Sequence, residues 1–125
     1  MSTHPIRSKT LSAKFSASAY DERYEMASVY CVDATANYCF SLTRFPGNEE
    51  IELMVHDQIL TKVLDLRLNL RGNVLTANVD HQVAADLDGF EEYVIRLEGS
   101  DANRAQLIEA LQKIFEGKNG FTLSA

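Results

Sequence analysis

The sequence predicts an α+β protein with about seven antiparallel strands in meander order and one amphipathic C-terminal helix packed on the sheet. Three observations lead to this class. Between residues 11 and 98, apolar and polar residues alternate in most segments, which is the period of a half-buried strand. Turn-forming glycine, proline, asparagine and aspartate residues separate several of these segments. After residue 100 the apolar spacing becomes three and four, the period of a helix.

The composition is that of one globular domain. The chain has 125 residues, of which 46% are hydrophobic and 24% charged. Residues 1–10 show no periodicity and are expected to form a flexible arm, so the domain is expected to span residues 11–125. No apolar run approaches the roughly 20 residues of a membrane span, and the N-terminus lacks the apolar core of a signal peptide. We therefore expect a cytoplasmic protein.

Four strands are expected in the first half of the chain, over residues 11–18, 24–33, 38–44 and 50–57. The first alternates small apolar residues with serines and carries only Lys14 as a charge, so it is a candidate edge strand for pairing two copies. Residues 24–33 are apolar at both sets of alternating positions, which is typical of a central strand covered on both faces.

The clearest strand pattern is the leucine ladder, residues 62–71, in which every second position from Leu64 to Leu70 is leucine and the intervening residues are polar. Because side chains on a strand change face at every residue, the pattern predicts one strand with four buried leucines. Gly72 suits a tight hairpin into a sixth strand at residues 74–80. A loop with a short helical turn is expected at 81–90, before a seventh strand at 91–98.

The C-terminal helix is expected to begin at a cap formed by Ser100 or Asp101 and to end at Gly117. Phe121 and Leu123 would then tuck the tail back or add a short strand. A pleckstrin-homology-like arrangement, a bent sheet closed by the helix, fits this element count. A flatter sheet with the helix across it fits equally well.

Neither catalysis nor a metal or cofactor is expected. The two histidine–carboxylate neighbours, His56-Asp57 and Asp80-His81, would form an acid–base or metal site only if both pairs converged in space. Cys31 and Cys39 have no zinc-ligand spacing. They would face each other across a three-residue loop and lie on opposite faces with a two-residue loop, and in a reducing compartment we expect two buried thiols.

The acidic residues suggest a binding role. The net charge of −6 argues against nucleic acid and permits a basic partner. Carboxylates gather at the start of the fourth strand and before the seventh, either as a solvated surface that keeps the protein soluble or as an electrostatic face for that partner. Tyr20, Tyr24 and Phe45, near turns, are candidate anchors at such an interface, although core roles would also suit them.

Four stretches carry a family resemblance: residues 38–44, residues 51–58, the leucine ladder with its hairpin partner, and residues 108–115. Their order resembles that of bacterial polymorphic-toxin immunity proteins, specifically the family numbered ten. Its members similarly run from an aromatic strand ending in arginine, here Arg44, through an acidic strand ending in Asp57-Gln58, to an amphipathic ladder and a final helix. After Gln58 the chain departs from the family, because residues 59–63 replace a stretch rich in glycine and tyrosine.

The resemblance implies a non-catalytic protein that binds and neutralises a cognate toxin made by the same cell. A homodimer through an edge strand is compatible with that role. An alternative is another binding module, a pleckstrin-homology-like or chaperone-like adaptor for a peptide or lipid head group, which would need a basic pocket for phosphates. The candidate partner-binding residues are Glu49, Glu50, Glu52, Asp57, Gln58, Asp86, Asp88, Glu91 and Glu92.

Overall fold

The computed structural model describes residues 7–21, 26–56 and 58–124. Within them the chain forms nine strands and two helices, and the predicted α+β class is confirmed. In chain order these are β1 (Ser8–Asp21), β2 (Met26–Asp33), β3 (Tyr38–Arg44), β4 (Ile51–His56), β5 (Ile59–Val63), β6 (Arg67–Arg71), β7 (Val74–Asn78), α1 (His81–Asp86), β8 (Glu92–Glu98), α2 (Asp101–Ile114) and β9 (Phe121–Ser124).

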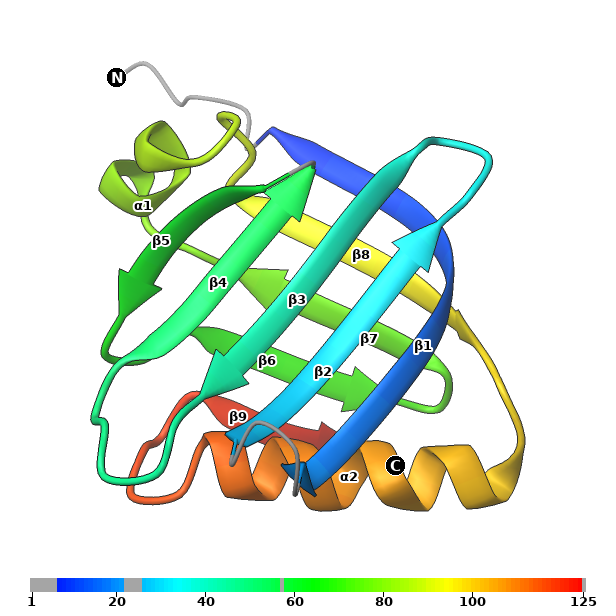
Figure 1. Cartoon of the computed structure of the whole chain (residues 1–125). Helices are drawn as coiled ribbons and strands as arrows, with labels where there is room; N and C mark the ends of the chain where they lie inside the picture. Colours follow the sequence, from blue (N-terminus) through cyan, green and yellow to red (C-terminus); the bar gives the residue numbers. More distant parts are fainter. Residues whose placement is uncertain (1–6, 22–25, 57, 125) are drawn as a thin grey trace.

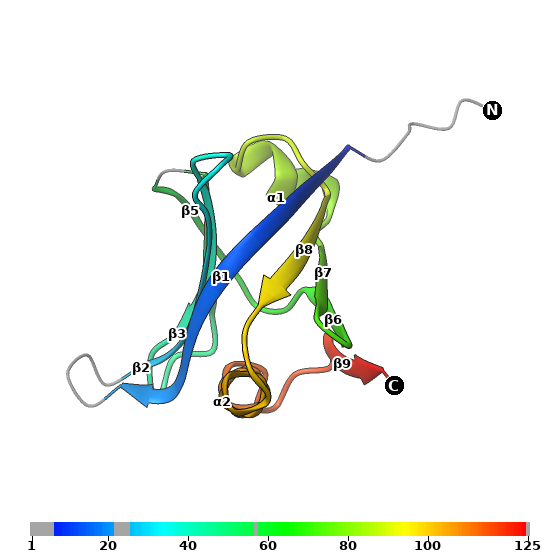
Figure 2. The ribbon, with the colours of Figure 1, turned by 90° about the vertical axis from the view of Figure 1, so that its right-hand side faces the viewer.

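All nine strands belong to one mixed sheet, so the prediction of about seven purely antiparallel strands is wrong in both number and direction. The strand order is β5-β4-β3-β2-β1-β8-β7-β6-β9. Two neighbouring pairs, β1 with β8 and β6 with β9, are parallel, and the other pairs are antiparallel. The sheet is bent into two layers with the core between them, as Figures 1 and 2 show.

Strand β1 passes from one layer to the other, which explains its length. Its first half, from Ser8 to Lys14, pairs with β8, and its second half, from Lys14 onward, pairs with β2. The strand starts three residues before the domain boundary expected at Leu11. It is also central, so the predicted edge at residues 11–18 is wrong and cannot pair two copies. Leu11 and Ala13 are buried between the layers.

Strand β2 is central, as predicted, but only one of its faces is covered. Val29 and Cys31 are fully buried, whereas the Tyr30 side chain between them is 43% exposed. The expectation that residues 24–33 are covered on both faces is therefore wrong. Residues 24 and 25 lie outside the described part of the chain.

The leucine ladder is divided between two strands, so its prediction as one continuous strand is wrong. Leu64 lies between β5 and β6 and is 63% exposed, while Leu66, Leu68 and Leu70 are buried. The Lys118 ammonium donates to the carbonyl of Leu64, and the Asp65 carboxylate accepts from the main-chain N–H of Asn119 at 3.1 Å. The C-terminal segment thus holds the chain in a turn here.

The tail after α2 completes this end of the sheet. Strand β9 pairs in parallel with β6, and the N–H of Leu68 donates to the carbonyl of Gly120 at 2.9 Å. Glycine is required there, because a Cβ atom on residue 120 would lie 1.7 Å from the Leu66 carbonyl oxygen. Of the two expected arrangements of the tail, the short added strand is the one observed.

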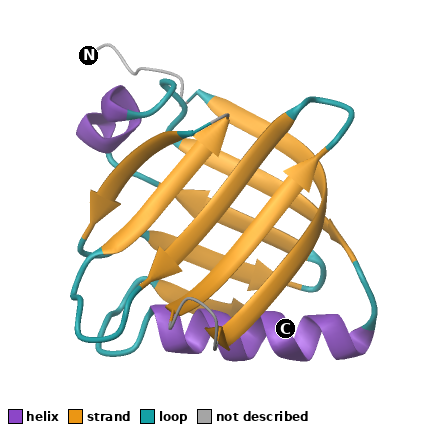
Figure 3. Cartoon of the chain, viewed as in Figure 1, coloured by secondary structure: helices purple, strands orange, loops and turns teal. Residues whose placement is uncertain are grey.

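Helix α2 lies across one open end of the bent sheet (Figures 1 and 3). Ser100 caps it as predicted, by accepting from the N–H of Asn103, whose side chain accepts in turn from the N–H of Ser100. The predicted apolar stripe faces the sheet, with Leu107, Leu111 and Ile114 fully buried. Neither helix in the described ranges has the length and apolar character needed to cross a membrane.

Candidate partner-binding surfaces

The acidic loop between α1 and β8 is fixed to both layers through Asp88. The Tyr93 hydroxyl, on β8, donates to one carboxylate oxygen at 2.8 Å, and the Tyr38 hydroxyl, at the start of β3, donates to the other. Burial, together with the hydrogen bond to Asp88, raises the pKa of both tyrosines above the ordinary value. Both phenols therefore remain protonated and can donate.

Aromatic and cationic side chains surround this network. The ring of His56, at the end of β4, meets the Tyr38 ring edge-on with 5.3 Å between centroids. The Lys9 ammonium lies 4.9 Å from the Tyr38 ring centroid, and the Arg7 guanidinium lies 5.0 Å from that of Phe90. The predicted strands 38–44 and 50–57 thus meet the acidic loop at the end of the sheet that carries α1.

The four candidate carboxylates near α1 differ in what they contact. Asp86 is exposed at the end of the helix, while Asp88 is held by the two tyrosines. Glu91 lies 3.4 Å from Nδ1 of His81, and Glu92 accepts from the Ser8 hydroxyl at 2.9 Å and from the Asn78 side chain at 3.2 Å. Much of this cluster therefore holds the fold together at the same time as it carries charge.

The remaining candidates lie elsewhere. Glu49 and Glu50 precede β4, at the opposite end of that strand from His56 and near the end of α2, where Lys118 donates to the Glu49 carbonyl. Glu52 lies on β4 opposite Lys62 of β5. Gln58 is exposed in the β4–β5 turn with φ of 70°. The two predicted acidic clusters are therefore not one continuous face, and Asp57 and Tyr24 lie outside the described residues.

The histidine–carboxylate pairs have separate contacts. His56 packs on Tyr38, the Asp80 carboxylate caps α1 by accepting from the N–H of Val83 at 2.8 Å, and His81 faces Glu91. Within residues 7–21, 26–56 and 58–124, no group of three or more histidine, cysteine or acidic side chains is placed to hold a metal ion.

The cysteines lie on opposite faces of the β2–β3 hairpin. A four-residue turn joins the strands, and Cys31 is paired with Phe40 while Cys39 is paired with Val32. Cys31 therefore faces the core and Cys39 the other side, and both are buried thiols, as expected. Burial, with a smaller contribution from Cys39, raises the pKa of Cys31 to about 12.

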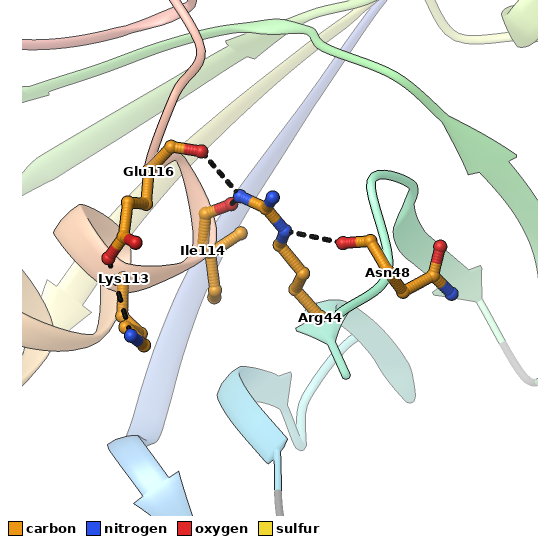
Figure 4. A network of polar contacts seen from close by, with 5 residues as sticks. All are labelled: Arg44, Asn48, Lys113, Ile114 and Glu116. Atoms are coloured by element: carbon orange, nitrogen blue, oxygen red, sulfur yellow. Dashed lines mark hydrogen bonds and ion pairs between the residues drawn. The ribbon is translucent and has the colours of Figure 1, made fainter. Parts of the chain in front are cut away.

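Arg44, which the resemblance singles out, binds main-chain carbonyls at the end of α2 (Figure 4). Its Nη1 atom donates to Ile114 at 2.9 Å and to Glu116 at 2.7 Å, and its Nε atom donates to the carbonyl of Asn48 at 2.8 Å. These three bonds join the β3–β4 loop to the helix. The contacts give Arg44 a clear structural role.

Strand register places the large apolar side chains Tyr30, Met54 and Leu60 in one row, together with the small, buried Ser41, and we call this the apolar row. It lies on the side of β2–β5 that faces away from the core, which we call the outer face. Tyr30, Ser41, Met54 and Leu60 are consecutive partners across β2, β3, β4 and β5. Tyr30 and Leu60 are 43% and 49% exposed, and Met54 is half-buried. Both helices lie on the other side of these strands (Figure 2).

Charged side chains on the outer face lie in the rows beside this apolar row. Glu52 and Lys62 are in the row toward α2, and Lys14 is in the row toward α1. This surface was not predictable from the sequence alone, because alternation shows which side chains point outward but not which become neighbours across strands. Two features of the sequence pointed to this surface: Met54 interrupts the polar face of the predicted strand 50–57, and apolar residues occupy both faces of 24–33.

Compared with models of known protein families, with curated proteins and with solved structures, the chain matches none of them. The family resemblance therefore rests on the order of the four sequence stretches.

Proposed function

We propose that this chain is an immunity protein, a non-catalytic protein that binds a cognate bacterial toxin domain and neutralises it. The outer face is its main docking surface. The observation that carries the proposal is the composition of this face, with an apolar centre and charged residues around it, which is the anatomy of protein–protein interfaces. The resemblance supplies the kind of partner, and implies action in the cytoplasm during competition between bacteria.

Two properties suit the outer face to binding. The solvent-facing side of an antiparallel sheet is ordinarily polar, so a row that contains Tyr30, Met54 and Leu60 leaves apolar area available to a partner. Each of these side chains stands on a hydrogen-bonded strand whose opposite face is in the core. The surface is thus held in position before binding, which lowers the entropic cost of association.

The acidic groups contribute to the approach of a basic toxin. The net charge is −6, and Asp86 and Glu91 lie near the end of the sheet that carries α1. Long-range attraction of this kind raises the association rate and is weakened by salt. Tyr30 and its neighbours would then determine the dissociation rate.

The proposal is tested with the product of the adjacent gene, since immunity genes usually lie beside their toxins. Leu60→Asp should weaken binding of that product by roughly a hundredfold and abolish protection of cells, because it places a charge in the apolar row of the interface. The matched control is Leu123→Asp on β9, since Leu60 and Leu123 are 49% and 51% exposed. Equal binding by both variants, or a wild-type protein that leaves the product fully toxic, would refute the proposal.

A further inference from the structure

Strand β5 forms one edge of the sheet, and its far side has no neighbouring strand among the described residues. It pairs with β4 through an uninterrupted register from Ile59 to Val63. On an edge strand, every second N–H and C=O group points away from the sheet. Lys62 is the single charged residue in β5, which also lacks proline and a bulge, two devices that commonly prevent strand addition.

A hollow of about 380 Å³ lies beside the end of β5. Val63, Leu66 and Val83 form part of its apolar lining, and Asp65, Arg67 and Asp80 also line it. Two carboxylates against one guanidinium leave an excess of negative charge there. Helix α1 lies near β5 and contributes Val83 to the lining, so the hollow lies between these two elements.

We propose that the toxin binds by adding an extended segment to the free edge of β5, which continues the sheet by one strand. This inference rests on the proposed function. Side chains on an added strand alternate between its faces. One set would extend the row that ends at Leu60, and the other set would enter the hollow beside Val63. The segment is therefore an alternating one, with apolar residues on the outer face and a lysine or arginine toward Asp65 and Asp80.

Continuity with the outer face selects β5 over β9, the other edge of the sheet. The apolar row runs across the sheet and reaches the edge at Leu60, so a strand added there extends the same contact surface. Strand β9 lies in the other layer, next to β6. It therefore serves as an internal control.

The test is residue-resolved amide hydrogen exchange of the full chain, free and mixed with the purified product of the adjacent gene. Alternate amides between Leu60 and Val63 should exchange at least roughly tenfold more slowly in the complex, because they become hydrogen-bonded, while β9 amides do not change. A complex in which β5 amides exchange as in the free protein overturns the strand addition and leaves the immunity function standing. Absence of any complex overturns both.

Proline substitution provides a second test. Consecutive residues of a strand direct their N–H groups to opposite sides, and proline has no N–H group. Of the two variants Thr61→Pro and Lys62→Pro, one therefore loses a hydrogen bond to β4, while the other loses only an N–H group that points away from the sheet. The variant that keeps the wild-type melting temperature should bind at least roughly tenfold more weakly. Wild-type affinity in that variant would contradict the inference.

Discussion

The guanidinium of Arg44 donates to the main-chain carbonyl of Ile114 at 2.9 Å and so ties the end of β3 to the end of α2. The last carbonyls of a helix have no partner inside the helix, and Arg44 supplies one from a strand 70 residues earlier in the chain. Two stretches of the family resemblance, 38–44 and 108–115, are thereby in direct contact.

Arg44→Ala should lower the free energy of unfolding by about 1–3 kcal/mol, because it leaves carbonyls of Asn48 and Ile114 without their donor. Arg44→Lys should recover only part of the lost stability, since a lysine ammonium lacks the planar guanidinium that contacts both the β3–β4 loop and the end of α2. Denaturant unfolding measures the difference. Lys113→Ala is the control, because its exposed ion pair with Glu116 should be worth less than about 1 kcal/mol. Equal stability of Arg44→Ala and wild type would contradict this role.

The division of the leucine ladder predicts unequal effects of two chemically identical substitutions. Leu68→Ala should cost about 2–5 kcal/mol, because Leu68 is fully buried. Leu64→Ala should change stability by less than about 0.5 kcal/mol, because Leu64 is mostly exposed in the turn. Thermal or urea unfolding of both variants measures these two changes in the free energy of unfolding. Similar losses would mean that the ladder is one continuous strand after all.

Alkaline pH should destabilise the protein through Tyr38 and Tyr93. Their folded pKa values are raised, mainly by burial, above the ordinary value near 10. Their contribution is complete below pH 10 and is lost as pH rises further, because the unfolded chain releases these protons first. Between pH 9 and 11, the free energy of unfolding should fall less steeply in the double variant Tyr38→Phe/Tyr93→Phe than in a protein that keeps both tyrosines. Both proteins should carry Cys31→Ala, since Cys31 also has a raised pKa.

Acid pH should act through Asp33. The main-chain N–H groups of Ser12 and Ala36 each donate to its carboxylate at 3.0 Å and hold its pKa below the ordinary 3.8. The stabilisation is present above that ordinary value and is lost as pH falls through the folded pKa. Asp33→Asn should be less stable than wild type at pH 7 and lose less on acidification. Parallel stability curves from pH 7 to pH 2 would refute this.

Local sequence patterns were sufficient to predict most of the strands and the long helix. The strand 38–44 has the predicted bounds, and the helix begins after Ser100 and buries its predicted stripe. Such features depend on alternation, helical spacing and caps, which involve residues close together in the chain. The nine-strand count and the parallel pairs could not be read in this way, because they arise from contacts such as that between β6 and β9.

The candidate site was predictable only in part. The acidic residues were identified from the sequence, but the attachment of Asp88 to Tyr38, 50 residues earlier in the chain, was not. The outer face was missed altogether, since Tyr30, Met54 and Leu60 become one row only through the register of four strands. The resemblance identified Arg44 without indicating that it contacts α2.

Local periodicity and capping chemistry were enough to predict the α+β class, the side chains that alternate toward the core and the residue at which α2 begins. The tertiary structure decided that the leucine ladder turns at Leu64, that β1 crosses between two layers and that an apolar row ends at the free edge of β5. The physical reason is that pairing energy comes from partners distant in the chain. The C-terminal segment around Lys118 and Gly120 outweighs the local preference of the ladder for one straight strand.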